Sequence, residues 1–209
     1  MFKKITALLF LGLILTGCQS ASSPDADKKQ EAEQPQKNMS EQPRILMVIA
    51  PQDFRDEEFN EPHEIFTNNN YKVDVASIQP GTATGVQGTE VEIDLTVGQV
   101  NVEDYRAVMF VGGPGMGKIV TDDSLQVLAQ KFHKNDKLTT AICIAPAILA
   151  HAGILKDKKA TSFPGAREAV ENNGAEFTGE TVTVDGNIIT GNGPEAASEF
   201  AHTVVKNLN

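Results

Sequence analysis

The chain has 209 residues, of which 40% are hydrophobic and 22% charged, and its formal net charge at pH 7 is −10. This length and composition are typical of one well-buried globular domain. The acidic charge argues against nucleic acid as a partner and against attraction to anionic lipid through protein charge.

The first residues have the pattern of an export signal. In "MFKKITALLFLGLILTGCQS", two lysines precede an apolar run that is too short to span a membrane. The run ends in Leu15-Thr16-Gly17-Cys18, which resembles the bacterial lipobox and implies cleavage before Cys18 and lipid attachment to it. We therefore predict a lipoprotein signal peptide over residues 1–17 and a protein of the cell envelope, lipid-anchored to a membrane outside the cytoplasm. A plain signal peptide that happens to contain a cysteine is the alternative.

Residues 18–43 are predicted to be a flexible tether. From residue 19 on, this stretch contains almost no large apolar side chains, so burial cannot offset the entropy lost on ordering it. The folded domain is expected to cover residues 44–209.

Within that domain, strand patterns alternate with helix patterns. The run "RILMVIA" at 44–50 is nearly unbroken in its apolar character, which is typical of a strand buried on both faces of a parallel sheet. The further expected strands are residues 71–78, 106–115, where the strand breaks into glycines, and 137–145, with a hairpin over 181–191 around Asp185-Gly186. The expected helices begin near Glu57, at Asp123, at Pro146 (with Gly153 as its stop) and at Pro194. This order predicts an α/β fold with a doubly wound, mostly parallel sheet sandwiched by helices, as in flavodoxin-like or amidotransferase-like proteins.

Three loops with unusual chemistry leave the expected strand ends. They are "APQDFRDEEF" at 50–59, "GGPGMG" at 112–117 and "ICIAP" at 142–146. In such sheets, functional sites gather at the carboxyl ends of the strands, so these loops are expected to form one site.

Cys143 is the candidate nucleophile of this site. It lies where a strand turns into a helix, the arrangement of a nucleophile elbow, and a helix N-terminus favours the thiolate. The glycine loop lacks the spacing of a phosphate loop, but as a flexible turn its N–H groups could hold an oxyanion. An acidic side chain from "DFRDEEF" turned toward the thiol would have a raised pKa and could donate a proton. A small buried apolar residue is the alternative role for Cys143.

The residues that carry this pattern resemble the DJ-1/PfpI family. The resemblance runs over residues 44–206 and rests on Asp-Phe-x-Asp-x-Glu at 53–58, "GGPG" at 112–115 and "AICIAPAILAHAGILKDKKATSFPG" at 141–165. It implies that Cys143 is the elbow cysteine and that Glu58 protonates or hydrogen-bonds its sulfur. It also implies that backbone groups of Gly112, Gly113 and Ile144 face the sulfur or an oxyanion. The habit of the family further implies a homo-oligomer.

One departure from the family narrows the function. The PfpI-type peptidases carry histidine directly after the cysteine, where this chain has Ile144, and Phe163 stands where other members carry another histidine. Among the remaining histidines, only His63 is a candidate accessory residue, because it follows Pro62 in the helix that carries Glu58. A Cys–His–acid triad is therefore not supported.

A cofactor-free site of Cys143 and Glu58 predicts action on small reactive carbonyls. The resemblance implies glyoxalase-like or deglycase-like activity, of hydro-lyase or hydrolase type. An oxidative-stress sensor that works through oxidation of Cys143 is an alternative, with an oxidant in place of the carbonyl substrate. A PfpI-type cysteine peptidase is disfavoured by Ile144, and a non-catalytic binding domain remains open. No His, Cys or Asp grouping has the spacing of metal ligands, so no metal is expected.

Overall fold

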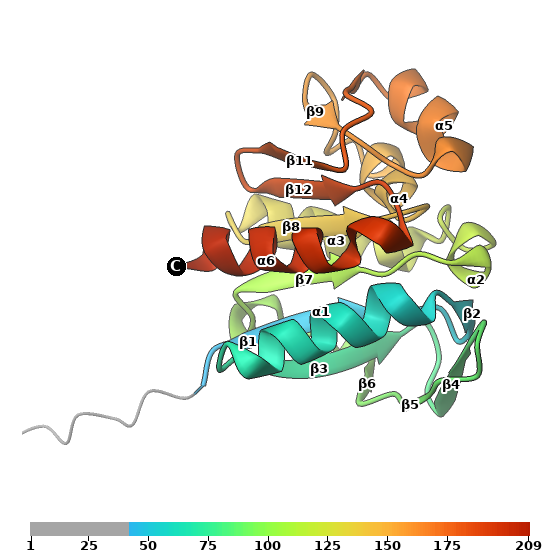
Figure 1. The fold of residues 1–209 in the computed structure, drawn as a ribbon, viewed down its shortest axis with the longest axis vertical. Helices are drawn as coiled ribbons and strands as arrows, with labels where there is room; N and C mark the ends of the chain where they lie inside the picture. The colour runs from blue at the N-terminus through green and yellow to red at the C-terminus, as the bar shows by residue number, and fades with distance from the viewer. Residues whose placement is uncertain (1–41) are drawn as a thin grey trace, which may run out of the picture. The chain divides into compact units, whose positions relative to one another are not determined.

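The computed structural model describes residues 42–209. The predictions made for the signal peptide, for Cys18 and for most of the tether lie outside these residues. Figure 1 shows the described part as a central sheet with helices packed against it.

The sheet has seven strands in the order β11-β12-β8-β7-β1-β3-β6. All neighbouring strands are parallel except β11 and β12, which form an antiparallel hairpin. The predicted doubly wound, mostly parallel sheet and its hairpin are therefore confirmed. The strands are β1 (Arg44–Val48), β3 (Lys72–Ser77), β6 (Leu95–Thr96), β7 (Ala107–Phe110), β8 (Leu138–Ile142), β11 (Val182–Asp185) and β12 (Ile188–Gly191).

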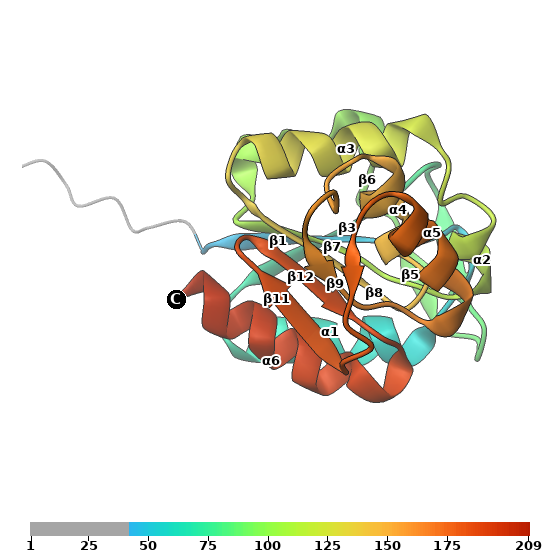
Figure 2. The ribbon, with the colours of Figure 1, turned by 90° about the horizontal axis from the view of Figure 1, so that it is seen from above.

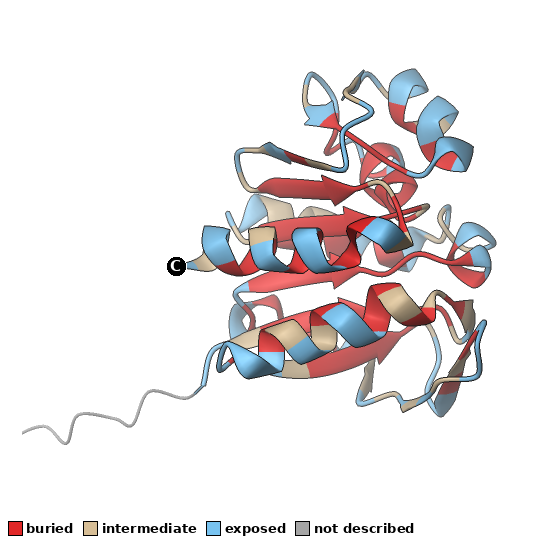
Figure 3. Ribbon diagram, viewed as in Figure 1, coloured by how far each residue is buried: buried red, intermediate tan, exposed pale blue. Residues whose placement is uncertain are grey.

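Helices cover both faces of this sheet, as Figure 2 shows from above. One face carries α1 (Asp56–Asn68) and α6 (Ala197–Leu208), and the other carries α3 (Asp123–Lys134) and α4 (Pro146–His151). Ile45 and Met47 belong to one buried apolar cluster, while Leu46 belongs to the other. Because successive side chains of a strand point to opposite faces, a strand covered on both sides must be apolar on both, which explains the run "ILMV" after Arg44. Figure 3 shows the buried residues concentrated in the sheet and on the helix surfaces facing it.

Several short elements were not predicted. A second sheet joins β2 (Gln52–Phe54), β4 (Thr82–Gly85) and β5 (Glu90–Glu92), and a third joins β9 (Lys159–Ala160) to β10 (Glu176–Phe177). Two short helices, α2 (Pro114–Gly117) and α5 (Arg167–Asn172), also appear. These segments are too short to show a periodic apolar pattern, so tertiary contacts decide their conformation. No helix within residues 42–209 is long and apolar enough to cross a membrane.

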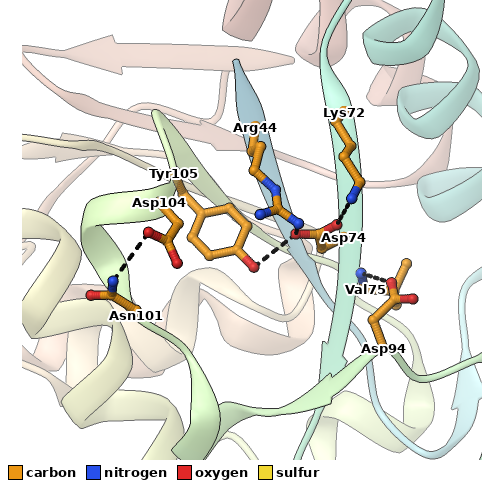
Figure 4. A network of polar contacts seen from close by, with 8 residues as sticks. All are labelled: Arg44, Lys72, Asp74, Val75, Asp94, Asn101, Asp104 and Tyr105. Atoms are coloured by element: carbon orange, nitrogen blue, oxygen red, sulfur yellow. Dashed lines mark hydrogen bonds and ion pairs between the residues drawn. The ribbon is translucent and has the colours of Figure 1, made fainter. Parts of the chain in front are cut away.

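A polar network joins the amino ends of the central strands (Figure 4). The buried carboxylate of Asp74 in β3 pairs with Arg44 of β1 at 2.7 Å and accepts a hydrogen bond from the Tyr105 hydroxyl at 2.9 Å. Lys72 lies farther away, at 3.7 Å. The Arg44 guanidinium also lies over the Tyr105 ring, 5.7 Å from its centre. Because these groups lie at the starts of the strands, the network ties together the edge of the sheet away from the strand ends that carry the site.

Candidate active site

Cys143 follows β8 directly and occupies a strained turn before α4. Its φ of +63° is in the left-handed region, which costs about 1–2 kcal/mol for a residue with a side chain. The turn is held from both sides, because the Cys143 N–H donates to the Gly191 carbonyl at 2.9 Å and its carbonyl accepts from the Phe163 N–H at 2.8 Å. The predicted elbow geometry is thus confirmed.

Glu58 is the acid that turns toward this cysteine. It lies in the first turn of α1 and is completely buried. Its Oε2 accepts a hydrogen bond from the Gly112 N–H at 3.0 Å, whereas Oε1 is buried without a hydrogen-bond partner. Burial raises the pKa of Glu58 to about 7, against the opposing effects of Cys143 and of the Gly112 N–H. The raised pKa predicted for an acid beside the thiol is therefore found.

The start of α1 is fixed by its neighbour Asp56. This buried carboxylate accepts the backbone N–H groups of Gln87 at 2.8 Å and of Thr89 at 2.9 Å, both in the turn between β4 and β5. Since Asp56 and Glu58 share one turn of helix, the unpredicted second sheet also positions the acid of the site.

The glycines permit the close approach of Cys143 and Glu58. A Cβ atom on Gly112 would lie 2.6 Å from both the Cys143 Cβ and the Glu58 Oε2, so only glycine fits between them. Gly113 has a φ of +109°, and a Cβ there would meet the Arg55 nitrogen at 2.5 Å. The expected strand-to-helix turn is present, since β7 ends at Phe110 and helix α2 begins at Pro114, and Gly115 packs against the Gln52 carbonyl.

The predicted backbone donors divide their roles. The N–H groups of Gly113 and Ile144 act on the sulfur and lower the pKa of Cys143, whereas the Gly112 N–H is occupied by Glu58. Only two of the three expected donors therefore face the sulfur.

The expectation that the elbow favours a thiolate is wrong for the resting site. Burial, followed by the negative charge of Glu58, raises the pKa of Cys143 to about 12 and outweighs both backbone donors. The helix that follows has only six residues. Near neutral pH the sulfur therefore keeps its proton, while Glu58 is close to its own midpoint.

A cavity of about 590 Å³ opens over the thiol. Its lining includes Cys143, Gly113 and Ile144, together with Arg55, Glu57, Pro114 and Gly117 from the two other loops that were expected at the site. Three further lining residues lie outside the expected loops: Phe163, Pro194 and Glu195. Pro194 and Glu195 come just after β12, so the rule that sites form at the carboxyl ends of strands could have indicated them.

His63 does not line this cavity. Its ring lies 5.5 Å from that of Phe59, and burial lowers its pKa. The other histidines of the described chain, His133, His151 and His202, are also absent from the cavity lining. Among residues 42–209, no group of three or more His, Cys, Asp or Glu side chains could hold a metal ion.

A parallel α/β sheet with a cysteine on a strand-to-helix elbow and a buried glutamate beside it defines a class of cysteine-centred α/β proteins. The sequence profile of the DJ-1/PfpI family matches residues 43–207, and the chain belongs to this family.

Relatives of known sequence and structure agree with this membership. The chain is 39% identical to "Uncharacterized protein MJ0967" of Methanocaldococcus jannaschii, over 95% of this chain and 93% of that protein. It is 31% identical to "Deglycase PH1704" of Pyrococcus horikoshii, over 78% of this chain and 98% of the relative. The crystal structure of a ThiJ/PfpI domain protein from Brachyspira murdochii superposes with a TM-score of 0.78 at 38% identity, covering 79% of this chain and 96% of that one.

Proposed function

We propose that the protein is a cysteine-dependent, cofactor-free enzyme that converts small 2-oxoaldehydes, or their adducts with amines, into 2-hydroxy acids. The observation that carries this proposal is the position of the buried Glu58 beside the protonated thiol of Cys143, which lines an open cavity. The pKa of Glu58 is about 7. A base with a pKa near the working pH is well suited to proton transfer. The deglycase names of relatives such as PH1704 agree with this chemistry.

The proposed reaction begins with addition of the Cys143 sulfur to the aldehyde carbon. As the S–C bond forms, the thiol proton passes to Glu58 and from there to the carbonyl oxygen, which gives a hemithioacetal. Glu58 then takes the proton from the former aldehyde carbon, which gives an enediol, and a proton is returned to the former ketone carbon. At the same time the hydroxyl on the former aldehyde carbon loses its proton and the former ketone oxygen keeps one, which gives the thioester of the 2-hydroxy acid. Water cleaves the resulting thioester, so that the net reaction is R–CO–CHO + H₂O → R–CH(OH)–COO⁻ + H⁺.

The backbone supports the same sequence of steps. The Gly113 and Ile144 N–H groups lower the pKa of Cys143, so they favour negative charge on the sulfur. Because Oε1 of Glu58 has no other hydrogen-bond partner, it is available to exchange the proton with sulfur and substrate.

The test is lactate formation from methylglyoxal by the full chain and by Cys143→Ala and Glu58→Gln. Each variant is expected to lose at least about a hundredfold in kcat/KM, the range typical of a lost general acid–base or nucleophile. Glu61→Gln is the matched control, since Glu61 is an exposed acid on the same helix. Equal turnover in Cys143→Ala would end the enzymatic proposal.

Two alternatives have their own signatures. A sensor would gain two oxygens on the Cys143 peptide under mild peroxide, but the raised thiol pKa weighs against rapid oxidation. A peptidase would cleave casein in a Cys143-dependent way, but no histidine of the described chain lines the cavity to act as base. A non-catalytic binding domain would give neither result.

The proposed setting is a membrane of the cell envelope, outside the cytoplasm, with the protein anchored through lipid on Cys18. This rests on the lipobox-like Leu15-Thr16-Gly17-Cys18. Protein produced in a bacterium is expected to partition into detergent, and Cys18→Ala into the aqueous phase; equal partitioning would contradict the anchor. A homo-oligomer is also proposed, to be checked by sedimentation.

A further inference from the structure

The cavity over Cys143 is lined by side chains of two chemical kinds. Arg55, Glu57 and Glu195 are charged, whereas Pro114, Ile144, Phe163 and Pro194 are apolar. A substrate that reaches the sulfur therefore meets both a polar and an apolar surface.

Phe163 is the most unusual of these apolar residues. Among the described residues, four large apolar side chains are exposed, and Phe163 is the only aromatic one and the only one that lines this cavity. Its exposed fraction is 45%. An aromatic ring left uncovered beside a nucleophile is a surface that a ligand can cover, and isolated exposed valines elsewhere need no such explanation.

The backbone fixes this ring relative to the sulfur. The Phe163 N–H donates to the carbonyl of Cys143 itself at 2.8 Å, and Phe163 begins a short helical turn at Pro164–Ala166. One edge of the ring lies 3.4 Å from the position of a Cβ on Gly165, and the other edge lies 3.9 Å from that of a Cβ on Gly193. The ring is thus held between two glycines and is part of the elbow's own framework.

Ile144 extends the same surface. It follows the nucleophile directly, and its Cδ1 lies 3.8 Å from the Gly165 Cβ position that the Phe163 ring also approaches. Both side chains therefore converge on Gly165 and form one continuous apolar patch next to the thiol.

We propose that this Phe163–Ile144 patch binds the substituent of the substrate and selects 2-oxoaldehydes whose R group is aryl or branched alkyl over methylglyoxal. The inference rests on the proposed function and names its substrate class. The reacting end, CO–CHO, lies at Cys143 between Glu58 and the backbone donors, and the R group covers the exposed ring. The reaction keeps the balance given above, and R takes no part in it.

The kinetic test compares kcat/KM for tert-butylglyoxal with that for methylglyoxal in the full chain. Wild type is expected to prefer the bulkier substrate, and Phe163→Ala to lower this ratio about tenfold, in line with loss of a large apolar contact. Phe163→Leu is expected to restore much of the ratio. The matched control is Val127→Ala in α3, another exposed apolar residue that does not line the cavity, which should leave the ratio unchanged.

A binding measurement separates this inference from the proposed function. Acetophenone and acetone are titrated into Cys143→Ala and into Cys143→Ala/Phe163→Ala by NMR. Tighter binding of acetophenone that is lost in the double variant supports the patch even if no glyoxal is turned over, in which case only the enzymatic proposal fails.

Two outcomes would overturn the inference. One is Cys143-dependent turnover with the same substrate ratio in wild type and Phe163→Ala. The other is that wild type shows no preference between the two substrates and that its oligomer dissociates in Phe163→Ala. The ring would then be covered by a second copy of the chain.

Discussion

Oε2 of Glu58 accepts the Gly112 N–H at 3.0 Å, while Oε1 of the same buried carboxyl has no hydrogen-bond partner. One oxygen therefore holds the side chain in place and the other is left for chemistry with Cys143. Gly112 lies between Glu58 and Cys143, so the positions of the three residues are linked.

Gly112→Ala should disrupt this arrangement. The added Cβ would lie 2.6 Å from both the Cys143 Cβ and the Glu58 Oε2, so one of them must move. We expect about 1–3 kcal/mol lower free energy of unfolding, measured by urea denaturation, and a large loss of activity. Gly98→Ala is the matched control, since nothing lies within 4 Å of its Cβ position. Equal activity and stability in the two variants would contradict the packing argument.

Glu58→Gln should change how stability depends on pH. The folded-state pKa is raised from 4.5 to about 7, so the favourable contribution of the protonated acid is complete below pH 4.5 and is lost as pH rises through 7. This shift corresponds to about 3 kcal/mol. Relative to wild type, Glu58→Gln should therefore gain up to about that free energy of unfolding between pH 4 and pH 8. Denaturation curves at several pH values measure it, and a constant difference would rule out the raised pKa.

Glu58→Gln should also make the thiol more acidic while it abolishes activity. The charge of Glu58 raises the pKa of Cys143, so its removal lowers that pKa. Iodoacetamide labelling of the Cys143 peptide against pH, followed by mass spectrometry, is expected to shift to lower pH in the variant. The peptide readout separates Cys143 from Cys18 in the full chain. A shift to higher pH would show instead that Glu58 stabilises the thiolate.

The strain at Cys143 predicts an unusual order of stability. With φ at +63°, Cys143→Gly should be about 1 kcal/mol more stable than Cys143→Ala, because only glycine adopts this conformation without penalty. In α4, by contrast, Ala147→Gly should cost about 1 kcal/mol. Thermal or urea denaturation measures the difference between glycine and alanine at each position. If alanine were the more stable residue at position 143 as well as at position 147, the elbow would not be strained.

Tyr105→Phe should cost about 1–3 kcal/mol in free energy of unfolding. It removes a 2.9 Å hydrogen bond to the buried, charged Asp74 in the network of Figure 4. Tyr71→Phe is a matched control, because the hydrogen bond from the Tyr71 hydroxyl to Asn209 is longer, at 3.4 Å. Chemical denaturation of both variants gives the comparison; equal losses would mean that the network adds nothing beyond an ordinary tyrosine contact.

Local pattern was enough for the main framework and for Cys143 as the candidate nucleophile, whereas Glu58 was assigned through the resemblance to the DJ-1/PfpI family. Apolar runs such as "RILMV" must be covered on both faces, so the alternating strands and helices already indicated a parallel sheet. The elbow position of Cys143 followed from a strand that meets Pro146. The short sheets and α2 did not follow, since segments of two to four residues show no periodicity. The presence of Phe163, Pro194 and Glu195 in the cavity lining did not follow either.

The amino-acid sequence alone therefore determined which loops meet at the carboxyl edge of the sheet. The alternation of buried strands and helices makes the sheet parallel, and in a parallel sheet the loops after the strands lie at the same edge. Only the tertiary structure decided the protonation of the site. Burial raises the pKa values of both Glu58 and Cys143, and desolvation depends on what packs around a group rather than on its neighbours in sequence. The tertiary structure also decided the place of Phe163, which lies twenty residues after Cys143 in the sequence. Its N–H donates to the Cys143 carbonyl, and its side chain lines the cavity over the thiol.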